Sequence, residues 1–374
     1  MAGPNNRQDR ELFYWLALRL APGVGSIRFA RLLRLFKSPE AVFKASAPDL
    51  ARLPRLPQKT INALTHFDWG RRVEDELKRV RDCGVKIITL NSPEYPARLK
   101  EIHDPPPVLW VAGGIRREDL AAVALVGSRG ATDYGRETAA RLAGDLAEAG
   151  VCVVSGMALG IDAAAHRGAL AAGGRTIGVL GCGLDIVYPR PNRDLFKRLP
   201  QSGALISEFP LGSEPEPGHF PVRNRIISGM SLAVVVVEAA EKSGALITAR
   251  LALEQNRDVM AVPGRAGSMK SRGTHALLKE GARLVETGRD ILDEIRPQLG
   301  PRPIDRPRSV APQPKLTSKA KEVWEAMGEE TMHIDQLGRK IGLTPSGLAP
   351  VLLDLELKGL IRQLPGMRYI RKSG

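Results

Sequence analysis

The chain has 374 residues, of which 43% are hydrophobic and 26% are charged, and its formal net charge at pH 7 is +14. This length exceeds what one compact core usually organises, so we expect two or three domains and, from the positive charge, a polyanionic partner. No apolar run reaches the roughly 18 residues that a membrane span needs, and the N-terminus lacks the apolar core of a secretory signal, so we predict a cytoplasmic protein that does not bind membranes.

The positive charge is concentrated at the two ends of the chain. The net charge is +7 over residues 1–104, +1 over residues 105–295 and +6 over residues 296–374. A central region that binds nucleic acid must therefore use locally placed cations and backbone amides rather than bulk charge. The three cysteines are scattered, and we interpret them as small buried hydrophobic residues: Cys83, Cys152 and Cys182.

The chain divides into four predicted segments. Residues 1–80 are helical in pattern, with few strand signals. Residues 81–295 alternate β-like apolar runs with helical patterns, which is typical of parallel strands joined by crossover helices. The runs are KIITL, VLWVAG, AAVALVGS, VCVVSGM, RTIGVLG, ALISEF, LAVVVVEA, DVMAVPG and ARLVE. Because these runs are continuously apolar, both sheet faces are covered, and the prediction is an α/β fold with an extended, Rossmann-like doubly wound sheet.

The last two segments are a linker and a small domain. Residues 296–315 contain six prolines and no apolar periodicity, which indicates a linker. The pattern of residues 316–374 predicts three short helices and two strands, which is typical of a winged-helix domain. Thr344 is a good N-cap with Pro345 at the first helical position, so the third helix is expected to begin there.

Ligands of open parallel sheets bind at the carboxyl ends of the strands, and here the segments that follow the strands are rich in glycine and serine. They are GSRGATDYG (residues 127–135), SGMALGID (155–162), GCGLD (181–185) and EAAEKSGALITA (238–249). Glycine allows close approach to a ligand, and the amides at a following helix start form an anion site. The sequence has no GxGxxG after the first central strand and no GxxxxGK[ST] loop, so we expect no nicotinamide cofactor and no ATP-driven chemistry.

Three clusters of side chains are candidates for contact with nucleic acid. Arg129, which follows Gly127 and Ser128, is placed to hold a phosphate, although it could instead pair with a surface carboxylate. Ser155 and Gly156, which open the second loop, are also candidates for contact with nucleic acid. The other two clusters are Phe220, Arg223, Asn224 and Arg225 in FPVRNRIISG, and Lys242, Ser243, Gly244 and Thr248 in the fourth loop.

Each of these clusters also has a structural interpretation. An aromatic side chain beside arginines can stack on a base while the arginines hold phosphates, but Phe220 could equally be core, with one arginine an internal ion-pair partner. Ser243 could be a plain N-cap beside a solvated lysine. Asp162 and His166 lie four residues apart on an expected helix and could share a metal, but no further ligands are evident and we interpret His166 as structural.

The motifs together resemble one family. SPEYPARL, PPPVLWVAGG, VALVGSRGATDYG, VVSGMALGIDAAAH, TIGVLGCGLDIVYPRPN, LISEFPLG, FPVRNRIISGMS and VVVEAAEKSGALITARLALEQNRDVMAVPG follow the order found in the DNA-processing protein A (DprA, also called Smf) family, from about residue 90 to residue 290. The resemblance implies a homodimer that binds single-stranded DNA without strong sequence preference. It also implies delivery of that strand to the RecA recombinase in natural transformation. Because the sequence lacks a Walker loop, a dinucleotide fingerprint and a recognisable ligand cluster, we expect no metal or cofactor and assign no catalytic residue.

The resemblance also assigns roles to individual residues. Gly127, Ser128 and Arg129 match the family's GSR triplet, and Arg223, Asn224 and Arg225 match its RNR triplet. Ser243, Gly244 and Thr248 match its SGxLxTA loop, in which this chain has Ala245 where many members have serine. The family usually carries a helical N-terminal module, and residues 20–33 and 50–67 look like two helix-hairpin-helix units, the second degenerate. The first hairpin, residues 22–25, could offer amides to a DNA phosphate.

Two other functions remain alternatives. A nucleoside-phosphate phosphoribohydrolase would use similar glycine loops, but its PGGxGTxxE motif is not intact in SGALITARLALEQ. A winged-helix transcription regulator would read duplex DNA, but its third helix begins with Ser346, Gly347 and Leu348, which offer few base-reading groups. We therefore expect a DNA-binding protein rather than an enzyme.

Overall fold

The computed structural model describes residues 7–66, 69–299, 316–328, 331–358 and 360–371. The chain forms two compact units, Met1–Asp305 and Arg306–Gly374, which are described separately. No helix within the described ranges is both long enough and apolar enough to cross a membrane.

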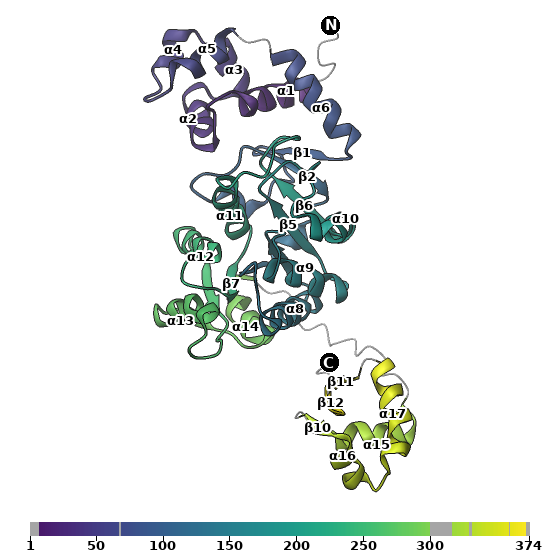
Figure 1. The fold of residues 1–374 in the computed structure, drawn as a ribbon. Coiled ribbons are helices and arrows are strands. Elements are labelled where there is room, and N and C mark those ends of the chain that lie inside the picture. The colour runs from purple at the N-terminus through teal and green to yellow at the C-terminus, as the bar shows by residue number, and fades with distance from the viewer. Residues whose placement is uncertain (1–6, 67–68, 300–315, 329–330, 359, 372–374) are drawn as a thin grey trace. The chain divides into compact units, whose positions relative to one another are not determined.

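The N-terminal module is helical, as its sequence pattern predicts (Figure 1). Its helices are α1 (Arg7–Leu20), α2 (Ser26–Phe36), α3 (Pro39–Lys44), α4 (Ala47–Ala51), α5 (Gln58–His66) and α6 (Trp69–Asp82). Ser38 and Ser46 cap the amides at the starts of α3 and α4, each followed by a proline in the first turn. The turn between α1 and α2 passes through Gly23, whose φ of +78° suits a residue without Cβ. The stacked rings of Trp15 and Phe29, 5.2 Å between centroids, pack in the module's core.

The nine apolar runs of residues 81–295 all form strands, in the order β1-β2-β6-β5-β4-β3-β7-β8-β9. The strands are β1 (Lys86–Thr89), β2 (Val108–Gly113), β3 (Ala122–Gly127), β4 (Cys152–Ser155), β5 (Thr176–Leu180), β6 (Gly203–Ser207), β7 (Ala233–Glu238), β8 (Asp258–Ala261) and β9 (Arg283–Leu284). The expectation of an all-parallel sheet is wrong for β1 and β2, because β1 pairs antiparallel with β2 and β2 antiparallel with β6. The segment between β1 and β2 holds only the four-residue helix α7 (Ala97–Lys100) and lacks the longer crossover helix that usually joins parallel strands.

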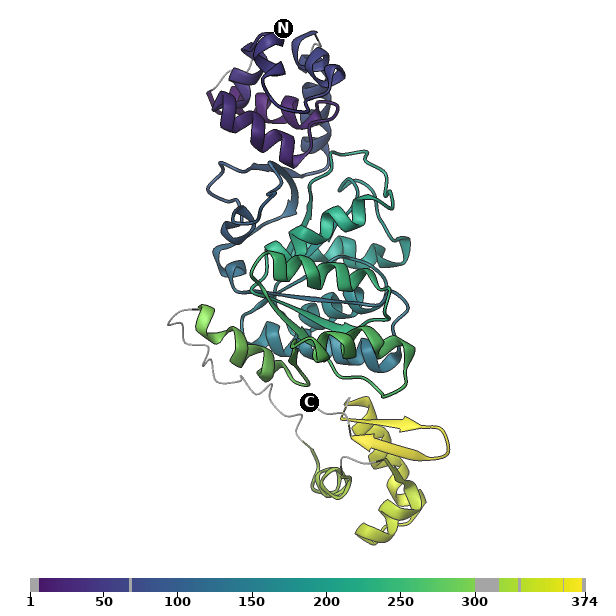
Figure 2. The ribbon, with the colours of Figure 1, turned by 90° about the vertical axis from the view of Figure 1, so that its left-hand side faces the viewer.

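Helices cover both faces of the sheet, which confirms the doubly wound α/β fold (Figures 1 and 2). One face packs against α8 (Asp133–Glu148), α9 (Ile161–Ala171) and α14 (Gly288–Leu299), and the other against α11 (His219–Gly229), α12 (Gly244–Glu254) and α13 (Arg272–Lys279). Side chains of β3 alternate between these cores, because Ala124 and Val126 lie in one and Val123 and Leu125 in the other. The remaining helix, α10 (Arg193–Ser202), packs near β6.

Two predictions about this unit need correction. Cys152 and Cys182 are buried as expected, but Cys83 is exposed, because it follows the last turn of α6. The predicted linker over residues 296–315 begins too early, since α14 continues through Pro297 to Leu299. Ile295 is fully buried in the core, which explains why the helix extends there. Residues 300–315 lie outside the described part of the chain.

The second unit is a winged-helix domain, as predicted. It contains α15 (Ser318–Ala326), α16 (Ile334–Ile341) and α17 (Pro345–Leu357) and a sheet ordered β10-β12-β11. Its strands are β10 (Met332–His333), which the sequence pattern did not reveal, β11 (Ile361–Leu364) and β12 (Arg368–Arg371). Thr344 caps α17 by accepting a hydrogen bond from the Gly347 amide, and Pro345 occupies the first turn.

Candidate nucleic-acid interface

An open pocket of about 440 Å³ lies at the carboxyl ends of β3 and β7. The chain winds from β3 outward through β4, β5 and β6, and then returns through α11 to β7 on the other side of β3. The strand order therefore reverses between β3 and β7, which is where open α/β sheets bind ligands. Val126 and Gly127 from β3, Phe220 from α11 and Ser243 and Gly244 from the start of α12 line this central pocket.

Arg129 and two aromatic rings lie together at this pocket. The guanidinium carbon of Arg129 is 5.1 Å from the ring centroid of Phe220, within cation–π range. The Tyr188 ring lies 5.6 Å from the Phe220 ring, and Tyr188 is 37% exposed. Arg129 is exposed, and no carboxylate of the described chain forms an ion pair with it. Its positive charge is therefore free to meet a ligand.

The loop that carries Arg129 is fixed by the start of α9. Gly160 has a φ of +77°, and a Cβ there would lie 2.2 Å from the Ser128 carbonyl oxygen. The Ile161 amide donates to that same oxygen at 3.2 Å. The backbone beside Arg129 is thus held by close packing that a larger residue at position 160 would prevent.

Arg223 has a different environment, because its guanidinium group is buried beneath the pocket. Its side chain donates hydrogen bonds to the carbonyl oxygens of Gly156 and Val179, and to the Asn224 side chain. A Cβ at Gly156 would lie 2.6 Å from Nη1 of Arg223, so glycine is required for this approach. Burial lowers the pKa of Arg223 to about 10, against the opposing effect of Asp162, and the group remains charged at pH 7.

Asp162 is the acidic residue of the pocket lining, and its carboxylate is already engaged. It accepts hydrogen bonds from the amides of Gly156 and Ala158 at 3.2 and 3.3 Å. Burial raises the pKa of Asp162, while Arg223 and these amides oppose the rise. The carboxylate thereby holds the second glycine loop against Arg223, a positioning role that the sequence pattern, which only raised a possible metal site with His166, did not predict.

The amides of the first glycine loop are only partly available. Ser128 donates its amide to the Glu238 carbonyl oxygen at 2.7 Å, and Thr132 donates its amide to the Glu238 carboxylate. Thr132 also caps the Gly135 amide at the start of α8. Two amides expected to face a ligand therefore have intramolecular acceptors, because Glu238 occupies the anion site of α8. The sequence signal for this was the acidic residue directly after the strand LAVVVV.

The start of α12 is one of the helix N-termini that line the pocket, together with the first turn of α11. Ser243 caps α12 by accepting a hydrogen bond from the Ala245 amide at 3.3 Å. Gly244 and the buried Thr248 also line the pocket. The positive end of the α12 macrodipole is thus directed at the pocket, as the strand-loop-helix pattern predicts.

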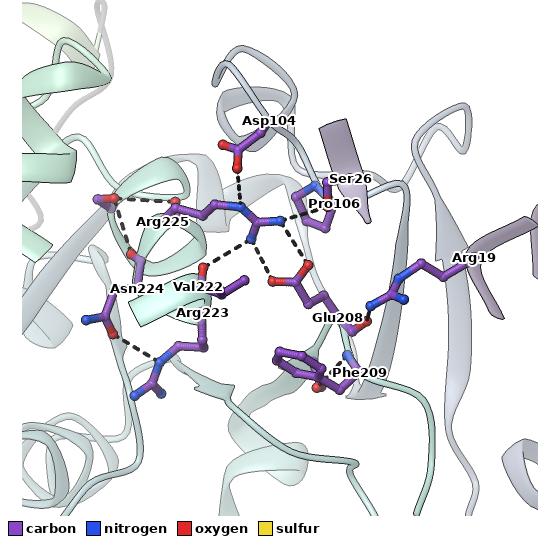
Figure 3. A network of polar contacts seen from close by, with 12 residues as sticks. Arg19, Ser26, Asp104, Pro106, Glu208, Phe209, Val222, Arg223, Asn224 and Arg225 are labelled. Atoms are coloured by element: carbon purple, nitrogen blue, oxygen red, sulfur yellow. Dashed lines mark hydrogen bonds and ion pairs between the residues drawn. The ribbon is translucent and has the colours of Figure 1, made fainter. Parts of the chain in front are cut away.

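Five of the predicted site residues do not line the central pocket. Gly156 lines a smaller cavity of about 100 Å³ that also contacts Arg129 and Phe220. Ser155 is buried and donates its hydroxyl to the Leu125 carbonyl oxygen. Ser128 and Lys242 lie beside the pocket residues Gly127 and Ser243 but are not part of the lining. Arg225 is the fifth, and its environment is shown in Figure 3.

Arg225 is the centre of a buried ion-pair network. Its Nη1 and Nη2 donate to the two carboxylate oxygens of Glu208 at 2.7 and 2.9 Å, and its Nε donates to Asp104 at 2.9 Å (Figure 3). Nη2 also donates to the Ser26 hydroxyl of α2, and Arg19 of α1 donates to the Glu208 carbonyl oxygen. The two arginines of the RNR triplet therefore point to different places. Arg223 lies under the pocket, and Arg225 ties α11 to β6 and the N-terminal module.

Sequence reasoning missed Tyr188, which lines the pocket beside Phe220. The sequence signal for Tyr188 was an aromatic residue in the segment that follows β5. The peptide bond between Tyr188 and Pro189 is cis. His166 is fully buried on α9, with Nδ1 2.7 Å from the Thr176 hydroxyl. No group of three or more metal-ligating residues occurs among the described residues.

Comparison with known proteins relates the chain to one family. Residues 86–296 match the model of the DNA recombination-mediator protein A family, and residues 307–367 match the DprA winged helix domain. The chain is 35% identical to Protein Smf of Synechocystis sp., over 97% of this chain and 100% of that relative. It is 43% identical to DNA processing protein DprA of Streptococcus pneumoniae, over 54% of this chain and 71% of the relative.

Solved structures agree with this relationship. The X-ray structure of DNA processing protein A from Streptococcus pneumoniae matches with a TM-score of 0.68 and 33% identity, over 75% of this chain and 97% of that one. A structure that concerns the single-stranded DNA binding mode of the Helicobacter pylori protein matches with a TM-score of 0.51 and 29% identity, over 57% of this chain and 96% of that one. The chain therefore belongs to the DNA recombination-mediator protein A (DprA/Smf) family.

Proposed function

We propose that the central pocket binds single-stranded DNA without strong sequence preference. Arg129 contacts a phosphate, the start of α12 receives a second phosphate, and a base stacks on the ring pair of Phe220 and Tyr188. The observation that carries the proposal is the exposed Arg129 guanidinium group, which lies over Phe220 and has no carboxylate partner among the described residues. An aromatic platform beside a free cation suits an unpaired nucleotide.

Several features favour a single strand over a duplex. The faces of duplex bases are hidden in the stack, so Phe220 and Tyr188 reach only an unpaired base. Residues 105–295 have almost no net charge, which disfavours binding a duplex by bulk electrostatics. The similar structure that concerns single-stranded DNA binding by the Helicobacter pylori protein is consistent with this choice.

Delivery of the bound strand to the RecA recombinase, and a homodimer as the working form, are also proposed. Membership of a recombination-mediator family supports the first. RecA filament formation on oligonucleotides coated with single-strand-binding protein should be faster with this protein than without it.

Sedimentation equilibrium at increasing protein concentration tests the proposed homodimer. A purely monomeric mass would contradict it.

We propose that the protein acts by binding rather than by catalysis. Asp162, the acidic residue of the pocket lining, is held by two amides and the Arg223 charge, so it is poorly placed to transfer protons to a ligand. Incubation with AMP should release no adenine. Steady release of free adenine would instead support a phosphoribohydrolase.

The test of the binding site is an Arg129→Ala variant of the full chain. Removal of one charge-assisted hydrogen bond to a phosphate should cost about 1.5–3 kcal/mol, roughly tenfold or more in affinity for an oligonucleotide. The plot of log affinity against log salt should flatten by about 0.7 for each phosphate that the protein no longer neutralises. Fluorescence anisotropy at three salt concentrations measures both quantities, with single-stranded and duplex oligonucleotides compared.

Arg289→Ala is the matched control, because Arg289 is 86% exposed on α14, away from the pocket lining. It removes the same charge and should leave affinity and slope unchanged. If Arg129→Ala is folded and binds as the control does, the phosphate contact proposed for Arg129 is wrong.

A further inference from the structure

A second hollow lined by arginines lies between the N-terminal module and the start of α11. One cavity of about 530 Å³ is bordered by α1, α2, Asp104, the segment after β6 and α11. A neighbouring cavity of about 680 Å³ runs along α2 and the segment that follows α4. Arg31 and Arg55 line both cavities, so the two adjoin each other. We call the pair the arginine groove.

The positive charge of this groove is not neutralised by its carboxylates. The acidic residues that line it are Asp104 and Glu208, and both are already paired with Arg225. Its other cationic residues are Arg19, Arg28, Arg31, Arg34, Arg52 and Arg55. Of these, Arg52 pairs with Asp49, while Arg31, Arg34 and Arg55 form no ion pair with any described carboxylate.

Arg19 adds to this unbalanced charge. It donates to the Glu208 carbonyl oxygen rather than to a carboxylate, and its buried Nε has no hydrogen-bond partner among the described residues. Burial lowers the pKa of Arg19, and the neighbouring Arg225 lowers it further, while Glu208 opposes both effects. A bound anion would relieve the repulsion between these guanidinium groups.

The groove also offers apolar surface between its cations. Ile27 and Leu35 of α2 are 49% and 45% exposed, and each lines one of the two cavities. These two side chains flank the arginines of α2, so the surface can meet both the phosphates and the bases of an unpaired strand. A small inorganic anion would leave the apolar positions unused.

The groove adjoins the central pocket through one turn of α11. Phe220 and Pro221 line the central pocket, whereas the next residue, Val222, lines the arginine groove and is 44% exposed. A chain that leaves the pocket across the first turn of α11 therefore reaches the groove directly.

We propose that single-stranded DNA extends from the central pocket over the first turn of α11 into the arginine groove, where Arg31 and Arg55 contact its phosphates. The N-terminal module is then part of the DNA-binding surface and lengthens the bound segment. This inference rests on the proposed function of the central pocket.

The test compares short and long oligonucleotides on the full-length protein. Labelled oligothymidylates of about 6 and about 20 nucleotides, one near the lower end of common single-strand site sizes and one above their upper end, are titrated against the wild type and the double variant Arg31→Ala/Arg55→Ala. Both side chains are exposed, so the variant should fold, which circular dichroism and a melting curve verify. Arg283→Ala/Arg289→Ala is the matched control, because it removes two exposed charges outside both binding surfaces.

The double variant should bind the long oligomer roughly three- to thirtyfold more weakly, the effect of two exposed charge contacts. Its salt slope should fall by about 1.4 for two phosphates. It should bind the short oligomer as the wild type does, and the control should match the wild type for both. Equal long-oligomer affinity in the double variant and the control would overturn the extension.

The outcomes also separate this inference from the function of the central pocket. If Arg129→Ala weakens binding of both oligomers while Arg31→Ala/Arg55→Ala changes neither, the pocket binds DNA and the extension alone is wrong. If the wild type binds neither oligomer, both proposals fail.

Discussion

Arg129, Arg223 and Arg225 carry the same charge but have different surroundings, and those surroundings separate their roles. Arg129 is exposed over an aromatic ring, Arg223 is buried against backbone carbonyl oxygens, and Arg225 is buried between two carboxylates. An exposed cation is available to a ligand, whereas loss of a buried cation that is paired within the protein destabilises the fold. Substitution of each should therefore affect a different measurement.

Phe220 allows the stacking contribution to be measured apart from charge. Phe220→Ala should weaken oligonucleotide binding by about 1–3 kcal/mol, because one base loses its aromatic platform. The salt slope should stay unchanged, since no phosphate contact is removed. Phe220→Tyr keeps the ring and serves as the control, with affinity close to that of the wild type. A slope that changed as much as in Arg129→Ala would argue against stacking.

His166 makes the stability of the protein depend on pH. The Thr176 hydroxyl donates its proton to the Val153 carbonyl oxygen, so Nδ1 of His166 must donate to Thr176. Nε2 is buried without a partner among the described residues, and a proton there would be a buried, unpaired charge. Burial is the largest cause that lowers the pKa of His166 to about 3, followed by Arg223 and Arg167.

The sign of this effect follows from the lowered pKa. Below a pH of about 6.5 the unfolded chain protonates this histidine and the native state does not, so stability falls as pH falls from there towards the folded pKa. Between pH 7 and pH 5 the free energy of unfolding should drop by about 2 kcal/mol more in the wild type than in His166→Gln. Urea titrations at several pH values measure this difference. Parallel pH profiles for the two proteins would contradict the assignment.

At the scale of elements, α11 joins the pocket to the rest of the unit. Its first turn carries Phe220, its second carries Arg223 under the pocket, and Arg225 points to β6 and α2. The helix is short and nearly all its later residues are buried, so it has no solvent-exposed face of a typical amphipathic helix. Displacement of α11 would therefore disturb both the pocket and the attachment of the N-terminal module.

Arg225→Ala should destabilise the protein rather than weaken its charge contact with DNA. Glu208 is buried, and removal of its partner leaves an uncompensated carboxylate, which typically costs about 3–5 kcal/mol. A large fall in melting temperature is expected, with the salt slope of binding retained at a temperature where the variant is folded. Arg289→Ala, which removes an exposed charge on α14, is the control and should keep both the stability and the slope of the wild type. An Arg225→Ala variant with wild-type stability and a flattened slope would instead show that Arg225 contacts phosphate.

On the scale of the whole molecule, the two compact units differ in what they hold. The central pocket and the arginine groove both belong to the unit Met1–Asp305, and the winged-helix domain has its own core. That core includes Leu348 and Leu352 of α17, so Leu348 is unavailable for reading bases. The surface cations of the two units therefore lie on separately folded domains.

A chain truncated after Leu299 should keep its affinity for single-stranded DNA within about threefold, or about 0.6 kcal/mol. The cut belongs after Leu299, because a shorter chain would lose the buried Ile295 and with it part of the core. Anisotropy of the truncated and full chains with the same oligonucleotide measures the change. A reduction greater than tenfold would make the winged-helix domain a principal contributor to binding.

The sequence alone determined the nine strands, the helical N-terminal module and the winged helix, because strand and helix periods and caps such as Thr344 are local properties. It also placed Arg129 and Ser243 at one edge of the sheet, because parallel strands end together. The tertiary structure alone brought Phe220 of α11 to the same place. Only the tertiary structure decided that β1 and β2 run antiparallel and that Glu238 occupies the start of α8. It also decided that Arg225 pairs with Glu208 while its neighbour Arg223 lies under the pocket. These features depend on which distant residues meet, and burial then selects the partner that satisfies each charge.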